Sequence, residues 1–221
     1  VRVVRMAKVT VKPGSSEGTP QGARAEATKA RIIRAAVQAF AADGFEGAST
    51  RQIAALAGEN QGLITYHFGN KQTLWKESVD SLLGGFRDAF LARVQMLSDA
   101  DPRSRMRLLI YFFVRYSAEH PDQMRLMVQE GKSVSPRTEW LVDRHLRPLY
   151  ALFSSLVSEA QEAGVLPDTP AVHLFYTLIG ATSLIFAHAP ECQALTGRDP
   201  MDPSMVEAHA ETICRLVLRD P

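Results

Sequence analysis

The stretch STRQIAALAGENQGLITYHFGNK, residues 49–71, decides how this chain folds. Ser49 or its neighbour can cap a short helix, and the spacing from Ser49 to Gln52 is typical of a capping box. Gly58 ends that helix, and Asn60 is placed to cap the next one. Apolar spacing predicts the buried positions of the two helices: Ile53, Ala54, Leu56 and Ala57 in the first, Ile64 and Phe68 in the second.

Longer helices are predicted on both sides of this stretch. Four upstream apolar residues recur at the helical spacing i, i+3, i+4, i+7, namely Ile33, Ala36, Val37 and Phe40. They predict a helix from Ala23 that stops at Gly44, and Asn70 is expected to cap a long helix that begins at Lys71. One helix followed by two short helices is the helix-turn-helix plan, in which the second short helix can enter the major groove of DNA.

The net charge of +1 over 221 residues conceals an uneven distribution. Residues 1–76 carry 11 Lys/Arg against 5 Asp/Glu, whereas the remainder carries 14 against 19. A basic N-terminal third suggests a polyanionic partner, although a basic tail on a neutral protein would give the same balance. Residues 1–22 combine basic residues with Pro, Gly and Ser, so they are expected to form a flexible basic arm.

The rest of the chain is expected to be helical, which makes the fold class all-α. Proline after a capping residue recurs as a helix-start signal. Helices are expected over Arg103–Glu119, Asp122–Glu130, Arg137–Ala163, Ala171–His188 and Ser204–Arg219. Pro148 is expected to bend the third of these, and residues 189–202 are expected to form a loop.

Composition and motifs exclude several classes of protein. The hydrophobic share of 46% can build a core, but no apolar run approaches the ~18–20 residues of a membrane span. The first residues lack the apolar region of a secretory signal, and two cysteines fit a reducing cytoplasm. Phosphate-binding loops and hydrolase motifs are absent, so neither an enzyme nor a cofactor is expected. His188, Glu191 and Cys192 lack a second pair of ligands, so no metal site is expected.

The motif residues match a known family in their order. They run from Ser49 to Gly58, continue as Gly62-x-Ile64-x-Tyr66-His67-Phe68, and end in Asn70-Lys71. This combination resembles the N-terminal domain of TetR/AcrR-type transcriptional regulators, and residues 57–60 and 64–71 look most like the CecR-type branch. The resemblance covers about residues 30–80, and the remainder is similar in its helical plan and length. It implies a three-helix helix-turn-helix DNA-binding domain at 23–71 and a helical domain for ligand binding and dimerisation at 72–221.

The resemblance also implies a function. We expect a homodimeric, sequence-specific transcriptional regulator, a repressor that a small-molecule effector releases from a palindromic double-stranded DNA operator. Two other classes stay open: a helical ligand-binding enzyme, and an adaptor whose exposed short helix docks a protein. Neither alternative has a motif of its own in the sequence.

Within the motif, residue chemistry sorts the expected DNA contacts. Arg51 suits guanine edges, and Gln61 suits adenine. Thr65 suits a base edge or a thymine methyl group, which Leu63 could also meet. Phenol, imidazole and ammonium groups suit phosphates, which assigns Tyr66, His67 and Lys71 to the backbone. The complete predicted set is Ser49, Thr50, Arg51, Asn60, Gln61, Gly62, Leu63, Thr65, Tyr66, His67 and Lys71.

Glu59 departs from the family pattern, which often has an apolar residue at this position. Its carboxylate is expected either near DNA or at the positive end of the following helix dipole. The resemblance implies a mainly apolar ligand cavity, and the predicted lining is Phe86, Phe90, Phe112, Tyr116, Met127, His145 and Phe153. It also implies that the last two helices pair with a second copy, where Gly180 and Ala181 permit close approach.

Overall fold

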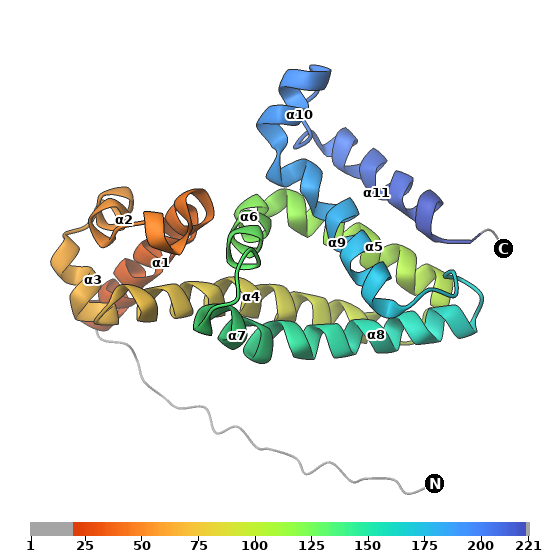
Figure 1. Cartoon of the computed structure of the whole chain (residues 1–221), viewed down its shortest axis with the longest axis horizontal. Coiled ribbons are helices and arrows are strands. Elements are labelled where there is room, and N and C mark those ends of the chain that lie inside the picture. Colours follow the sequence, from red (N-terminus) through yellow and green to blue (C-terminus); the bar gives the residue numbers. More distant parts are fainter. Residues whose placement is uncertain (1–19, 220–221) are drawn as a thin grey trace, which may run out of the picture.

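The structure, a computed structural model, describes residues 20–219, and within that range every regular element is helical (Figure 1). The predicted all-α class is therefore confirmed. Residues 1–19 of the predicted arm lie outside the described residues, and the first helix begins within the remainder of that arm. The helices are α1 (Pro20–Gly47), α2 (Thr50–Ala57), α3 (Gln61–Phe68), α4 (Lys71–Met96), α5 (Pro102–Glu119), α6 (Pro121–Glu130), α7 (Pro136–Leu141), α8 (Arg147–Glu162), α9 (Ala171–Ala187), α10 (Ala189–Thr196) and α11 (Pro203–Val217).

Side-chain caps separate the first four helices where the sequence predicts. Three side-chain oxygens accept a backbone N–H from the turn that follows: Ser49 from Gln52, Asn60 from Gly62 and Asn70 from Thr73. The Gln52 amide donates to Asp43 at 2.7 Å instead of returning to Ser49, so the capping box is half formed. Gly44 kinks the end of α1 with φ 69°, and Gly58 ends α2 with φ 67°, a region that favours glycine.

One apolar core holds these helices together. Its buried members include Phe40, Ile53, Ile64, Phe68, Leu74 and Trp75. The same core continues into α6 through Leu126 and into α7 through Leu141. The two predicted domains are thus joined by continuous apolar packing and by α4, so a change in one can be felt by the other.

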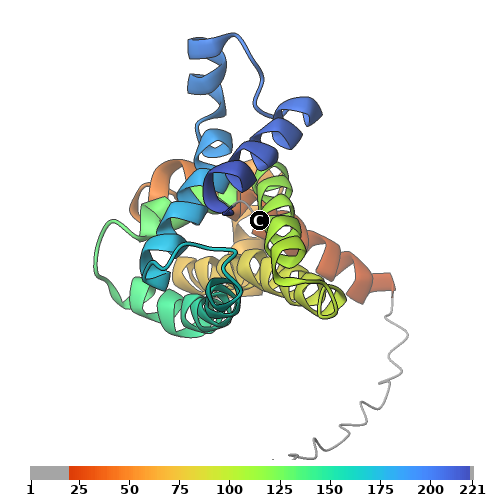
Figure 2. The ribbon, with the colours of Figure 1, turned by 90° about the vertical axis from the view of Figure 1, so that its right-hand side faces the viewer.

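The second core lies at the opposite end of the molecule. Figure 1 shows α4 running along its length, with α1–α3 near one end and α5, α8, α9 and α11 toward the other. The buried members of this second core include Met106, Val114, Val157, Leu174, Phe186 and Ile213. In the end-on view of Figure 2, α10 projects away from the rest of the helices.

The predicted helix Arg137–Ala163 is divided into three parts. α7 and α8 are separated by a π-helical turn over Val142–Leu146. Pro148 lies in the first turn of α8, and it has no N–H to complete the helical hydrogen bond to the preceding turn. The effect predicted for Pro148 therefore takes the form of a local π turn.

The predicted loop at residues 189–202 is wrong over its first half. Residues Ala189–Thr196 form α10, which is turned by 73° from α9. Pro190 lies in the first turn of this helix, where no backbone donor is needed. Gly197, with φ 71°, ends it. Proline and glycine here mark the two ends of a helix.

Candidate nucleic-acid interface and ligand cavity

α3 presents a polar face to solvent and an apolar face to the core. Gln61, Thr65 and Tyr66 are exposed, and Tyr66 is 79% accessible. Ile64 and Phe68 are buried, in agreement with their predicted packing role. Because polar residues face outward from a helix anchored on its opposite side, α3 has the geometry of a recognition helix.

The remaining predicted residues of α3 lie between these two faces. Leu63 is half-buried and packs against the core, so only part of it is open to a partner. His67 is half-buried, with its ring edge-on to Tyr66 at 5.0 Å between centroids. The Asn60 side-chain oxygen is occupied in capping Gly62, 2.8 Å from its backbone nitrogen.

A hydrogen bond ties α3 to α2. The Gln61 amide donates to the Thr50 hydroxyl at 3.1 Å. Arg51, next in the first turn of α2, is exposed on the surface. The bond orients Gln61 beside the predicted contact residues of α2 before any DNA arrives, which lowers the ordering cost of recognition.

Lys71, the first residue of α4, is folded back onto the end of α1. Its ammonium lies 4.5 Å from the Phe45 ring centroid and 3.4 Å from the Glu46 carbonyl oxygen. The guanidinium of Arg137, in α7, lies 3.9 Å from the same ring centroid. Phe45 therefore attracts two cations, one from each predicted domain.

Arg137 also gathers two carboxylates around this ring. It lies 3.4 Å from Glu46 and 3.4 Å from Glu130, whose side chain is buried. Sequence reasoning missed both Phe45 and Arg137. Phe45 directly follows the helix-ending Gly44, which could have marked it as a packing residue. No periodicity in the sequence could have connected Phe45 to Arg137, which lies far along the chain.

Glu59 has a partner that the sequence analysis did not predict. Its carboxylate pairs with Arg31 of α1, which also donates to the Thr28 hydroxyl at 2.9 Å. The Glu59 side chain is mostly shielded, with 14% exposure. The ion pair neutralises an acid next to the candidate DNA surface and fixes the turn between α2 and α3 to α1.

A cavity of about 590 Å³ lies between α4, α5, α6, α7, α8 and α9. Five of the seven predicted lining residues border it: Phe86, Phe90, Tyr116, Met127 and Phe153. The sequence analysis did not place Gln123, Phe175 and Tyr176 in the lining. Phe175 and Tyr176 are consecutive on α9, so helical spacing could not have indicated that both border the same hollow.

Phe112 and His145 are corrections to that prediction. Phe112 lies outside the lining, where its ring stacks on Phe86 at 6.3 Å and lies under the guanidinium of Arg93. His145, in the π-helical turn, is buried with its Nε2 2.9 Å from an oxygen of Asp80 in α4. Both side chains support the cavity wall from behind.

A second hollow of about 420 Å³ lies between α1, α4 and the junction of α5 with α6. Tyr116, His120 and Gln123 border this hollow and the larger cavity. The Tyr116 and His120 rings meet edge-on at 4.2 Å between centroids. These three side chains form the partition between the larger cavity and a cleft that reaches α1.

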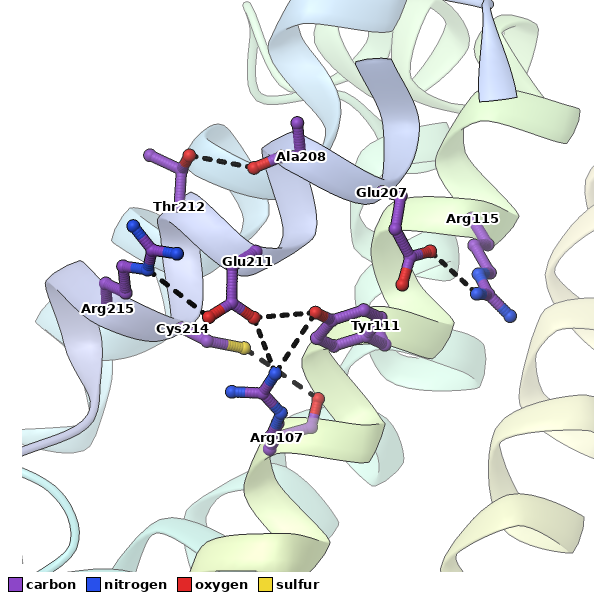
Figure 3. Close-up of polar contacts among 9 residues, drawn as sticks. All are labelled: Arg107, Tyr111, Arg115, Glu207, Ala208, Glu211, Thr212, Cys214 and Arg215. Atoms are coloured by element: carbon purple, nitrogen blue, oxygen red, sulfur yellow. Dashed lines mark hydrogen bonds and ion pairs between the residues drawn. The ribbon is translucent and has the colours of Figure 1, made fainter. Parts of the chain in front are cut away.

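α11 is fixed to α5 by a polar seam (Figure 3). Glu211 accepts from Tyr111 at 2.7 Å and from Arg107 at 2.6 Å, and a second pair joins Arg115 to Glu207.

Burial raises the pKa of the neighbouring Cys214 thiol to about 11, so this thiol stays protonated and unreactive at neutral pH.

The outer faces of α9 and α11 carry exposed apolar side chains. Tyr176 and Leu184 on α9 and Leu216 on α11 are each more than half exposed. At Gly180, no heavy atom lies within 4 Å of an added Cβ position. Large exposed apolar side chains on two packed helices are candidates for an interaction site.

Two further features of the described residues bear on function. Within residues 20–219, no group of three or more His, Cys, Asp and Glu side chains could hold a metal ion, and His188 instead pairs with Glu191 at 3.2 Å. In the same range no single helix is long and apolar enough to cross a membrane, although α9 and α10 together meet the length and composition criteria as a pair bent by 73°.

An exposed, core-anchored third helix on an all-helical body defines the chain as a helix-turn-helix DNA-binding protein. Residues 32–77 match the family model described as bacterial regulatory proteins, tetR family, and residues 102–217 match the tetracyclin repressor-like C-terminal domain. The chain therefore belongs to the TetR family and is a DNA-binding transcriptional regulator.

Individual relatives agree with this assignment. The chain is 26% identical to the HTH-type transcriptional regulator RutR of Escherichia coli K12 over 207 residues, which is 93% of this chain and 96% of RutR. It is 32% identical to the HTH-type transcriptional repressor SCO4008 of Streptomyces coelicolor, over 70% of this chain and 76% of that protein. The crystal structure of HlyIIR, a hemolysin II transcriptional regulator, shares the fold with a TM-score of 0.65 and 21% identity, over 89% and 99% of the two chains.

The buried His145 predicts a pH-dependent stability. Burial lowers the pKa of His145, and this effect outweighs the Asp80 carboxylate, which acts to raise it. In the unfolded chain this imidazole binds a proton near pH 6.5, whereas in the folded chain it stays neutral to a lower pH. Below that pH the free energy of unfolding is therefore expected to fall by up to about 1.4 kcal/mol per pH unit.

Urea unfolding between pH 7.5 and 5 measures this slope. The variant His145→Gln should lose the part of the slope that belongs to this imidazole, whereas His173→Gln, which changes an exposed histidine on α9, should keep it. An unchanged slope in His145→Gln would contradict the assignment.

Proposed function

We propose that this protein is a homodimeric repressor that leaves a palindromic DNA operator when a small molecule occupies its cavity. The observation that carries the proposal is that one helix borders both candidate sites. α4 begins with Lys71 at the candidate DNA surface, and farther along its length Phe86 and Phe90 line the cavity. SCO4008 is named as a repressor, which supports the same sign of regulation here. Since its target would be DNA, the protein is proposed to act in the cytoplasm.

The proposal assigns separate tasks to two parts of the chain. Residues 23–71 bind DNA, and residues 72–221 bind the effector and the second subunit. Base edges are read by Arg51 in the first turn of α2 and by Gln61 and Thr65 on α3, because all three side chains are exposed. Tyr66, His67 and Lys71 position the protein on phosphates.

A gel shift with the DNA that flanks the gene tests the function. A specific, competitor-resistant complex is the expected result. A folded chain that leaves this DNA unshifted would favour the other two classes, a ligand-binding enzyme or a protein-docking adaptor. The sequence contains no catalytic motif, so we expect no enzymatic activity.

Contacts to bases and to phosphates should differ in their mutational response. Gln61→Ala is expected to relax preference at one base pair in each half-site, at a cost of roughly 1–3 kcal/mol there. Lys71→Gln should weaken binding to all sequences and reduce the salt dependence by about one unit of slope. Titration of operator and random DNA at several salt concentrations measures both effects. If both variants lost affinity equally on the two DNAs, the sorting of contacts would be wrong.

The second subunit is proposed to cover the outer faces of α9 and α11. Gly180 lies on that surface, and its open surroundings mean that a larger side chain meets nothing within the chain itself. Gly180→Arg is therefore expected to give a folded monomer with weak operator binding, because one half-site contact forfeits the energy of the other. Sedimentation and circular dichroism measure the two properties. The control is Thr177→Ser, a conservative change on the same helix, which should stay dimeric.

The glycine pair in α4 is a candidate hinge for effector response. α4 is unbroken at this point; an added Cβ would meet nothing within 4 Å at Gly84 and would lie 3.9 Å from the Tyr116 hydroxyl oxygen at Gly85. Close packing therefore does not require glycine. The double change to Ala should raise the free energy of unfolding by about 1 kcal/mol per site and keep the effector-free DNA affinity.

The effector response is the decisive measurement for this hinge. The double variant is expected to need a different concentration of effector for release from operator DNA. The effector would be the first compound found to raise the melting temperature of the parent protein. Identical release curves for variant and parent would remove the hinge and leave the regulator assignment intact.

A further inference from the structure

We propose that the 590 Å³ cavity takes a neutral, largely hydrocarbon molecule whose polar end donates a hydrogen bond to the side-chain oxygen of Gln123. This inference rests on the proposed function, in which the cavity is the effector site. It deepens that function by naming the chemical class of the effector.

The walls of the cavity are mainly rings and thioethers. The members that share this character are Phe86, Phe90, Phe113, Phe153, Phe175, Met106, Met124 and Met127. A volume of about 590 Å³ lies within the range of pockets that enclose small organic ligands. Methionine and phenylalanine adapt to hydrocarbon shapes and offer no strong hydrogen bonds, so most of the ligand must be apolar.

Two of the three buried hydroxyl side chains of the lining already have acceptors, and the third, Ser117 of α5, can donate to or accept from a ligand. Thr182 donates to the Leu178 carbonyl oxygen at 2.7 Å, and Ser183 donates to the Ile179 carbonyl oxygen of the same helix. Both hydroxyl protons are therefore already used in hydrogen bonds within α9. Neither side chain needs a polar group of the ligand as an acceptor.

Gln123 differs from these hydroxyls. Its side-chain oxygen is buried and has no hydrogen-bond partner among the described residues, and a rotation of the side chain toward the cavity would bring it to a ligand. It lies in the first turn of α6, in the partition beside Tyr116 and His120. A carbonyl oxygen can only accept, so the group that satisfies it must carry an N–H or O–H. A buried oxygen without a hydrogen bond costs free energy, so a ligand that donates a hydrogen bond at this point binds more tightly than one that does not.

The charges around the cavity argue against an anionic ligand. Lys132 is the one Lys, Arg, Asp or Glu side chain among the lining residues; it is exposed, and its ammonium donates to Gln129 at 3.0 Å. The Tyr116 phenol is kept neutral because burial raises its pKa. A carboxylate in the interior would thus be buried without a paired cation, which is strongly unfavourable.

Three probes built on a ten-carbon chain separate these requirements: 1-decanol, decyl methyl ether and decanoate. They share one chain and differ in carrying a donor, only an acceptor, or a negative charge. Calorimetric titration of the full-length protein at pH 7.5, without DNA, is expected to show decanol binding at least about tenfold more tightly than either of the others.

Variants on one helix locate the interaction. Gln123→Met preserves length and removes the acceptor, so it should bind decanol and the ether alike. Gln129→Met, a change outside the lining of the same helix, should keep the preference for decanol. Lys132→Gln should also leave the preference unchanged.

Four results would overturn the proposal. They are binding of decanoate as tightly as decanol, a preference for the ether, an unaltered preference in Gln123→Met, and no binding of any probe. A gel shift of the operator is scored separately. If decanol binds as expected and leaves DNA binding unchanged, the ligand class stands and the effector function fails.

Discussion

The packing of Trp75 between Phe45 and Trp140 joins the end of α1 to α7, which borders the cavity. Trp75 is fully buried near the start of α4, with Phe45 edge-on at 6.4 Å and Trp140 of α7 edge-on at 5.6 Å between centroids. Phe45 belongs to the end of α1, and Trp140 lies next to Leu141 in the cavity wall. Loss of a buried tryptophan costs about 3–5 kcal/mol, so this contact also sustains much of the stability of the core.

α5 and α7 connect this contact to the cavity and to α11. The face of α5 that carries Phe113 and Tyr116 borders the cavity, whereas its Arg107 and Tyr111 hold α11 through Glu211. α7 places Thr138 at the cavity and the neighbouring Arg137 on Phe45. Under the proposed function, occupation of the cavity would act on groups that contact both the DNA-binding helices and the surface proposed to pair. Linkage would then be reciprocal, since DNA would weaken effector binding by the same factor.

Local rules predicted most of the helix-turn-helix and failed where distant residues meet. Caps at Ser49, Asn60 and Asn70 act within one turn, so their residue types were sufficient to place the helix starts. Glu59 was assigned from its neighbours, yet its partner Arg31 lies in another helix. No periodicity could show this pairing.

The cavity prediction shows the same limit. Aromatic residues at helical spacing indicated which faces turn inward, and most of the chosen side chains border the hollow. Phe112 and His145 were also inward, but they pack against a ring and a carboxylate behind the wall. Whether an inward side chain meets a neighbour or empty space depends on the volumes of several helices at once. Pro190 was misread for a simpler reason, because proline opens helices as readily as it interrupts them.

The unbroken length of α4 makes it a mechanical lever. Its 26 residues extend for about 39 Å at 1.5 Å per residue. Phe90, at the cavity, lies 19 residues from Lys71, which is about 28 Å along the helix. A tilt of one degree about Phe90 would move the end at Lys71 by about 0.5 Å. About seven degrees would therefore carry it roughly one base-pair rise, ~3.4 Å along the duplex. Under the proposed function, a tilt of this size would be enough to shift a recognition helix relative to its half-site.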